Sequence, residues 1–188
     1  MLKRVANQSS RIQKKAKKAP LSVLLSQTES SAPPDFPKIP LSQKALERLL
    51  GLVLKELNVD QKYLYYLQKR GRPQSLELHL CEDIEMRSYQ KQFRKLDRTT
   101  DVLSFPSLES PENHLEGFMG TLIVSLPTVL RNAKRYKKDF KTELTEVFVH
   151  GVLHLLGFDH VKVTLKERQR MRVVQKKIMK IVCGSSQD

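Results

Sequence analysis

Val147 to Phe158 is the longest apolar run in the chain, and it limits the possible fold more than any other feature. A helix that spans a membrane needs roughly 18 or more consecutive apolar residues, so this run is too short for one. It also contains His150 and His154, which favours a helix buried inside a protein. We therefore predict a buried helix from Thr142 to Leu156, ended by Gly157, because glycine readily adopts the left-handed conformation that stops a helix.

The remaining segments alternate between helical and strand-like patterns. Helices repeat apolar residues every three or four positions, whereas half-buried strands alternate apolar with polar residues. We expect strands at 21–27, 76–80, 102–105 and 122–124, and helices beginning at Ser42, Asp83, Pro127 and Thr164. Ser42 and Asp83 are the expected N-caps, and the Asp83 helix should reach about Phe93. This order predicts a single domain of the α/β (α+β) class, with a central mixed sheet packed by helices.

Basic residues outnumber acidic ones by 34 to 20, and the net charge of +14 predicts an anionic partner such as nucleic acid. Residues 1–19 contain seven of these cations, no acid and little apolar content, so we expect a disordered basic arm. An organellar transit peptide is the alternative interpretation of this arm. The two cysteines lie far apart, which favours a reducing compartment, and we expect a cytoplasmic protein that does not associate with membranes.

Three of the five histidines, His150, His154 and His160, fall within eleven residues. The first two are one helical turn apart, so their imidazoles leave the same face of the helix. Gly157 can reverse the chain and return His160 to the other two rings. Three neutral imidazoles with an open fourth position are typical of catalytic zinc, so we predict one zinc ion per chain, held by this helix and the following turn. The alternative is that His150 and His154 are hydrogen-bonded histidines of the core.

The same spacing occurs in the metzincin zinc proteases, whose signature is H-E-x-x-H-x-x-G-x-x-H. Their general base is the glutamate that follows the first histidine, and Gly151 stands at that position here. Peptide hydrolysis would need a base from elsewhere in the chain. A zinc protease is therefore the second choice.

Three blocks of sequence resemble a known family. Residues 150–160, HGVLHLLGFDH, closely resemble the signature H-G-x-L-H-L-x-G-Y-D-H of the YbeY family of metal-dependent endoribonucleases. Residues 93–106, FRKLDRTTDVLSFP, are similar to the family's Y-R-x-x-D-x-P-T-D-V-L-S-F-P, and residues 119–125, MGTLIVS, to its L-G-D-I-V-I-S. The chain departs from the pattern at Phe158, usually tyrosine, at Thr99, usually proline, and at Thr121, usually acidic.

The resemblance runs from about Leu21 to Val182. We therefore expect an endoribonuclease domain at residues 20–183, with the basic arm at 1–19 before it and a tail at 184–188 after it. Membership of the family would imply cleavage of single-stranded RNA, a role in ribosomal RNA maturation and ribosome quality control, and the ribosome or ribosomal proteins as partners.

The resemblance also implies that Arg94 faces the metal cleft as a catalytic residue, since its planar guanidinium matches a phosphate. Lys91, Lys95 and Arg98 are further candidates for RNA binding. Asp159, next to the third histidine, is a candidate for orienting a metal ligand. The alternative from another class of function is a ribosome-assembly or RNA-binding factor whose zinc is structural.

Overall fold

The computed structural model describes residues 21–27, 38–58, 60, 63, 73–107, 117–158 and 165–184. Its strands are β1 Ser22–Gln27, β2 Ser75–Cys81, β3 Val102–Pro106 and β4 Phe118–Ser125. Its helices are α2 Gln43–Leu57, α4 Asp83–Tyr89, α5 Leu126–Arg135, α6 Phe140–Leu155 and α7 Leu165–Gly184, with the π-helical segment η1 Gln90–Arg94 directly after α4. The predicted arm at 1–19 lies outside the described residues, as does the tail beyond Gly184. None of the described helices is long and apolar enough to cross a membrane.

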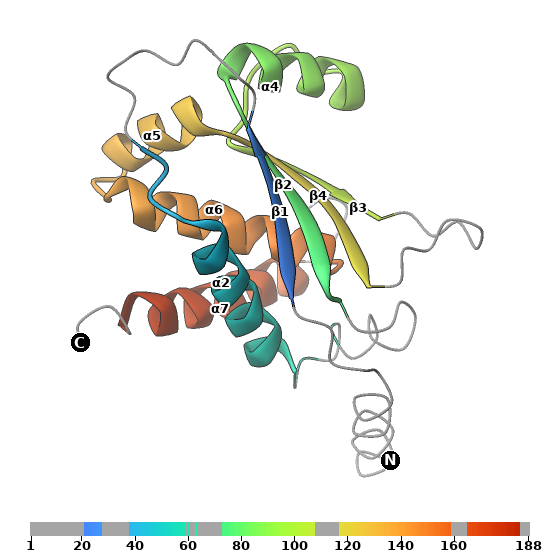
Figure 1. Cartoon of the computed structure of the whole chain (residues 1–188), viewed down its shortest axis with the longest axis vertical. Helices are drawn as coiled ribbons and strands as arrows, with labels where there is room; N and C mark the ends of the chain where they lie inside the picture. The colour runs from blue at the N-terminus through green and yellow to red at the C-terminus, as the bar shows by residue number, and fades with distance from the viewer. Residues whose placement is uncertain are drawn as a thin grey trace.

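The strands form one mixed sheet in the order β1-β2-β4-β3. β1 runs parallel to β2, and β2 runs parallel to β4, whereas β3 pairs antiparallel with β4 at the edge. Figure 1 shows α2, α6 and α7 on one side of this sheet and α4 on the other. The expected α/β (α+β) class with a central mixed sheet is confirmed.

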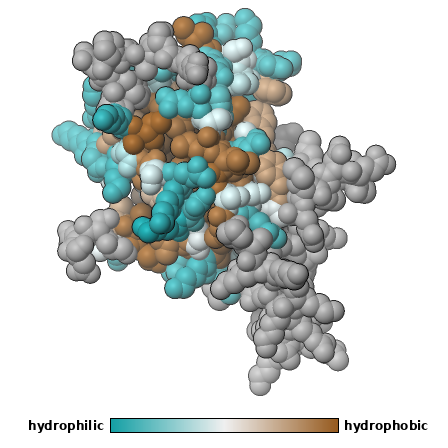
Figure 2. All heavy atoms as spheres, viewed as in Figure 1, coloured by the Kyte–Doolittle hydropathy of each residue, from teal (hydrophilic) through white to brown (hydrophobic). Residues whose placement is uncertain are grey.

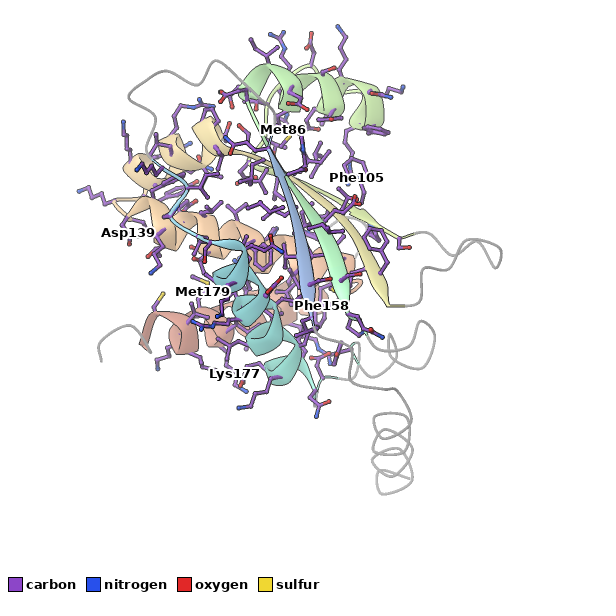
Figure 3. All side chains as sticks on the ribbon, viewed as in Figure 1. Met86, Phe105, Asp139, Phe158, Lys177 and Met179 are labelled. Carbon is purple, nitrogen blue, oxygen red and sulfur yellow. The ribbon has the colours of Figure 1, made fainter. Side chains whose placement is uncertain are left out.

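Each face of the sheet has its own hydrophobic core. The larger core joins the sheet to α2, α6 and α7, and its fully buried residues include Val53, Leu122, Phe148, Val152 and Met171. The smaller core consists of Cys81, Met86, Leu103 and Ile123, with Tyr89 and Phe105 packed against it. Figure 3 shows Met86 and Phe105 on the side of the sheet that carries α4. In the space-filling view of Figure 2, hydrophobic residues gather toward the middle of the visible face and hydrophilic residues surround them.

Local sequence signals account for several of the helix boundaries. The Ser42 side chain accepts a hydrogen bond from the Ala45 backbone N–H at 3.2 Å, so the predicted N-cap of α2 is confirmed. Proline occupies the first turn of α5, where its missing N–H leaves no helical bond unmade. After α6, Gly157 has a positive φ of 84°, which is the conformation expected of a residue that ends a helix.

The helix predicted from Asp83 to about Phe93 differs from the prediction at both ends. Glu82 is the N-cap, and no side chain caps this end. The Asp83 carboxylate instead accepts hydrogen bonds from Ser125 and Thr128 at the start of α5, at 2.6 and 2.7 Å, so the prediction that it caps α4 is wrong. At the other end, α4 stops at Tyr89 and the chain continues as η1, after which Lys95 adopts a left-handed conformation.

Candidate active site

His150 and His154 leave α6 one turn apart, and their rings face each other. The Nε2 atoms are 3.1 Å apart, the ring centroids lie 4.7 Å apart, and the ring planes meet at 80°. Two nitrogens bound to one tetrahedral zinc at roughly 2.0–2.1 Å would be about 3.3 Å apart. Both side chains are only partly buried. The pair therefore fits two positions of a metal site that solvent can reach.

Gln175 of α7 fixes the orientation of the first imidazole. Its Oε1 atom lies 2.9 Å from Nδ1 of His150. Because an amide oxygen only accepts, Nδ1 must donate, and the neutral ring then has its lone pair on Nε2. That is the atom that faces His154. Metal-binding histidines generally have such a partner on the other ring nitrogen, so this contact favours a metal site over a pair of core histidines.

The third predicted ligand, His160, lies outside the described residues, as does Asp159. Within the part of the chain that the structure describes, no group of three or more His, Cys, Asp or Glu side chains could hold a metal ion. The described portion of the site therefore consists of His150, His154 and Gln175.

Gly151 lies against the sheet. A Cβ atom at this position would be 2.9 Å from Cδ2 and 3.0 Å from Cδ1 of Leu122, which is buried in β4. A side chain at position 151 would therefore point into the larger core. A glutamate there, as in the metzincin proteases, would have no room to act as a base.

Arg94 is the last residue of η1, a segment that packs on the opposite face of the sheet from α6. It is exposed and, among the described residues, makes no hydrogen bond or ion pair, so it does not contact His150 or His154 directly. The edge strand β3 lies between these groups: Phe105 contacts Phe93 of η1 on one face, and Val102 packs into the larger core on the other. The segments that carry Arg94 and the two histidines, η1 and α6, thus border the same edge strand from opposite faces.

The other predicted RNA-binding cations surround Arg94. Lys91, Lys95 and Arg98 are all exposed. Lys91 lies 3.7 Å from the carboxylate of Asp97, which Arg87 also binds at 2.7 Å. Asp97 is the only acid between residues 87 and 98, where there are five cations. The segment therefore keeps a strongly positive surface.

Asp83 is a half-buried polar centre whose partners sequence reasoning did not identify. Burial raises the pKa of its carboxyl, but hydrogen bonds from Arg131, Ser125 and Thr128 outweigh burial and hold the pKa below its usual value. The Oγ1 atom of Thr99 lies 3.4 Å from the same carboxylate, so the residue that replaces the usual proline joins this cluster. The cluster fixes α4 to the start of α5.

Thr121, which replaces the usual acidic residue, donates a hydrogen bond to Glu77 on the neighbouring strand at 3.0 Å. The carboxylate at this point of the sheet is thus supplied by β2 instead of β4. This hydrogen bond stabilises the sheet by linking β2 to β4.

Comparison with known proteins gives consistent matches. The family described as "YbeY: Endoribonuclease YbeY" matches residues 36–182, which include Arg94, His150, His154 and His160. The endoribonuclease YbeY of Mycoplasma mobile is 36% identical over 123 residues, covering 64% of this chain and 78% of that protein. The endoribonuclease YbeY of Desulforamulus reducens is 35% identical over 139 residues, covering 71% and 86%. The solution structure of TM1509 from Thermotoga maritima, 28% identical, aligns over 87% of this chain and 90% of that one with a TM-score of 0.48.

Proposed function

This chain belongs to the endoribonuclease YbeY family, and we propose that it cleaves single-stranded RNA at a metal site built on His150 and His154. The observation that supports this proposal is the 3.1 Å distance between Nε2 of His150 and Nε2 of His154, together with the contact by which Gln175 orients the His150 ring. The metal is zinc, one ion per chain, because neutral imidazoles are ligands that zinc prefers. His160 is the third ligand, and Asp159 orients it.

A zinc ion held at this site would supply positive charge to polarise a phosphodiester oxygen and to lower the pKa of a bound water. His150 and His154 hold that ion, and Gln175 keeps the first ring in the tautomer that binds. Arg94, which is exposed and makes no hydrogen bond or ion pair among the described residues, reaches over the edge strand β3 to this phosphate, binds it with its planar fork and stabilises the charge that develops there. Lys91, Lys95 and Arg98 bind neighbouring phosphates and keep the RNA on this surface.

Ribosomal RNA is the substrate we propose, with the ribosome or its proteins as partners in the cytoplasm. Ribosomal RNA is an abundant polyanion that suits the net charge of +14. The protease alternative is disfavoured because the side of α6 that would carry its general base packs against Leu122. An RNA-binding factor with structural zinc would suit the same net charge, and only the absence of RNA cleavage would distinguish it from an endoribonuclease.

Metal analysis joined to an RNA cleavage assay tests the proposal. We expect about one zinc per wild-type chain, and loss of both metal and cleavage in His150→Ala, His154→Ala and His160→Ala. His79→Gln is the matched control, since this histidine is hydrogen-bonded to Ser26 and Glu85 and should leave the metal content unchanged. Full metal occupancy in all three alanine variants would refute the site. Zinc-loaded protein that binds RNA without cutting it would favour the assembly factor.

Arg94→Ala separates the two parts of the site. We expect it to abolish cleavage while zinc content and folding stay near wild type, because Arg94 is exposed and makes no hydrogen bond or ion pair among the described residues. Arg94→Lys should restore cleavage only in part, since an ammonium lacks the bidentate fork. Wild-type turnover in Arg94→Ala would reduce this residue to a surface cation.

A further inference from the structure

Four aromatic rings form a continuous row on the α4 side of the sheet. His79 of β2 meets Tyr89 of α4 edge-on, with centroids 6.5 Å apart. Tyr89 stacks on Phe93 of η1, with centroids 6.3 Å apart and planes inclined by 22°. Phe93 meets Phe105 of β3 edge-on at 5.0 Å. Phe93 is therefore supported by rings on two sides.

The row is anchored at its inner end. One oxygen of Glu85 accepts a hydrogen bond from the Tyr89 hydroxyl at 3.1 Å and lies 3.0 Å from Nε2 of His79. His79 is also bonded through Nδ1 to Ser26 of β1 at 2.9 Å. Tyr89 and Phe105 both pack against the smaller core. These contacts hold Phe93 in one place, so little entropy is lost when it receives a ligand.

Phe93 is 52% exposed, although the two neighbouring rings hold it in place. It is followed by Arg94, which makes no hydrogen bond or ion pair within the part of the chain that the structure describes, and exposed cations at Lys91, Lys95 and Arg98 lie within a few residues. An exposed aromatic ring with several exposed cations close by in sequence suits a ligand with flat apolar groups on a polyanionic backbone. Single-stranded nucleic acid has this chemistry, because its bases stack on aromatic side chains and its phosphates bind cations.

We propose that the exposed face of Phe93 is a stacking platform for one base of single-stranded RNA, with the neighbouring cations binding the adjacent phosphates. The platform rests on the proposed function, since it names how the substrate of that site is held. A duplex keeps its bases stacked on each other, so the platform selects single strands. It acts on any base, because every base has a π face.

Tyr136 provides a matched control on another part of the surface. It is 53% exposed and is also flanked by basic residues. Its ring is already covered by Arg135 and Lys138, whose charged groups lie 5.8 and 5.6 Å from the centroid. It has the exposure and local charge of Phe93 without the supporting aromatic row.

The test compares binding of a short single-stranded RNA with binding of an abasic oligoribonucleotide of the same length, using the full chain and checking by gel that the RNA stays intact. Phe93→Leu should weaken binding of the normal RNA by about 5- to 150-fold, the range for one stacked base, and leave the abasic affinity unchanged. The salt dependence should also stay unchanged, because the ring carries no charge. Phe93→Tyr should bind like wild type, and so should Tyr136→Leu.

Three outcomes would overturn the platform: wild-type affinity in Phe93→Leu, an equal loss with the abasic strand, or an equal loss in Tyr136→Leu. An equal loss with the abasic strand would mean that Phe93 serves an apolar contact unrelated to bases. The proposed function fails separately. If Phe93→Leu binds RNA normally while cleavage still depends on His154, the stacking platform is refuted and the proposed function is not. If the protein binds RNA in a base-dependent way but never cleaves it, the proposed function is refuted and the platform is not.

Discussion

At the scale of single residues, Gln175 shows that a sequence can indicate an important polar side chain without identifying its partner. Gln175 lies four positions after Met171 and three before Ile178, and both of those residues are fully buried. A polar side chain on the apolar face of a helix needs a hydrogen-bond partner, so its importance could have been read from the pattern. Its partner could not, because His150 is 25 positions away and only the packing of α6 on α7 brings them together.

The His150–Gln175 contact leads to a prediction about metal affinity. Gln175→Leu removes the acceptor that fixes the imidazole tautomer, and we expect zinc affinity to fall by about 10- to 100-fold. Gln175→Glu keeps an acceptor oxygen and should retain the metal. Competition with a chelator measures both, and thermal unfolding of the metal-free proteins controls for packing. Equal affinity in wild type and Gln175→Leu would mean that this contact does not orient a ligand.

Asp83 leads to a prediction about pH. Its pKa is held below the usual value in the folded protein, so its stabilising effect is complete above about pH 4, near the unfolded pKa, and is lost as the pH falls through the folded value. Asp83→Asn should lower the free energy of unfolding at pH 7 by about 1–3 kcal/mol. The difference from wild type should shrink below pH 4. Urea denaturation at neutral and acid pH tests this, and a deficit independent of pH would contradict it.

At the scale of elements, the positions of strands and helices followed from the sequence more reliably than their ends. The apolar spacing that predicted α2, and the run that predicted α6, gave boundaries close to those observed. The helix after Asp83 was predicted through about Phe93, whereas its last part is π-helical. The cause is tertiary, since Phe93 contacts Phe105 of a strand that follows in sequence. Such contacts override local helix preference.

The contact between α6 and β4 predicts the effect of substitutions at Gly151. Gly151→Ala crowds Leu122, which costs about 1–3 kcal/mol, but gains up to about 1 kcal/mol of helix propensity, so we expect modest destabilisation. Gly151→Glu would force a charged group into the larger core and should destabilise the fold far more. Thermal unfolding ranks the two variants. A stable Gly151→Glu protein that hydrolyses peptides would contradict this account and revive the protease alternative.

At the scale of the whole molecule, the functional groups are divided between two layers that share an edge strand. Membership of the family was predicted from three motifs and is confirmed by the match over residues 36–182. The motifs could not show that η1, which ends at Arg94, and α6, which carries His150 and His154, pack on opposite faces of the sheet, because this depends on how β3 is placed between α6 and η1. An RNA strand that reaches both groups must pass the β3 edge. Charge along its path then determines how tightly it binds.

The basic arm at residues 1–19 is a further source of positive charge, and its removal tests whether it contributes to RNA binding. Residues 1–19 contain seven cations and no acid, and they lie outside the family match. If they attract RNA electrostatically, deleting them should weaken binding to all sequences alike. The log–log slope of affinity against salt should also fall, by at most about 5, since each phosphate contact on a single strand contributes roughly 0.7. Cleavage at saturating RNA should persist, because His150, His154 and Arg94 remain. Phe93→Leu provides the opposite pattern, lower affinity with an unchanged salt slope, so the two variants separate charge from stacking. Mass spectrometry of the native protein identifies the alternative, a transit peptide, by its absence from the mature chain, and an unchanged affinity and slope after deletion would show that the arm does not bind RNA.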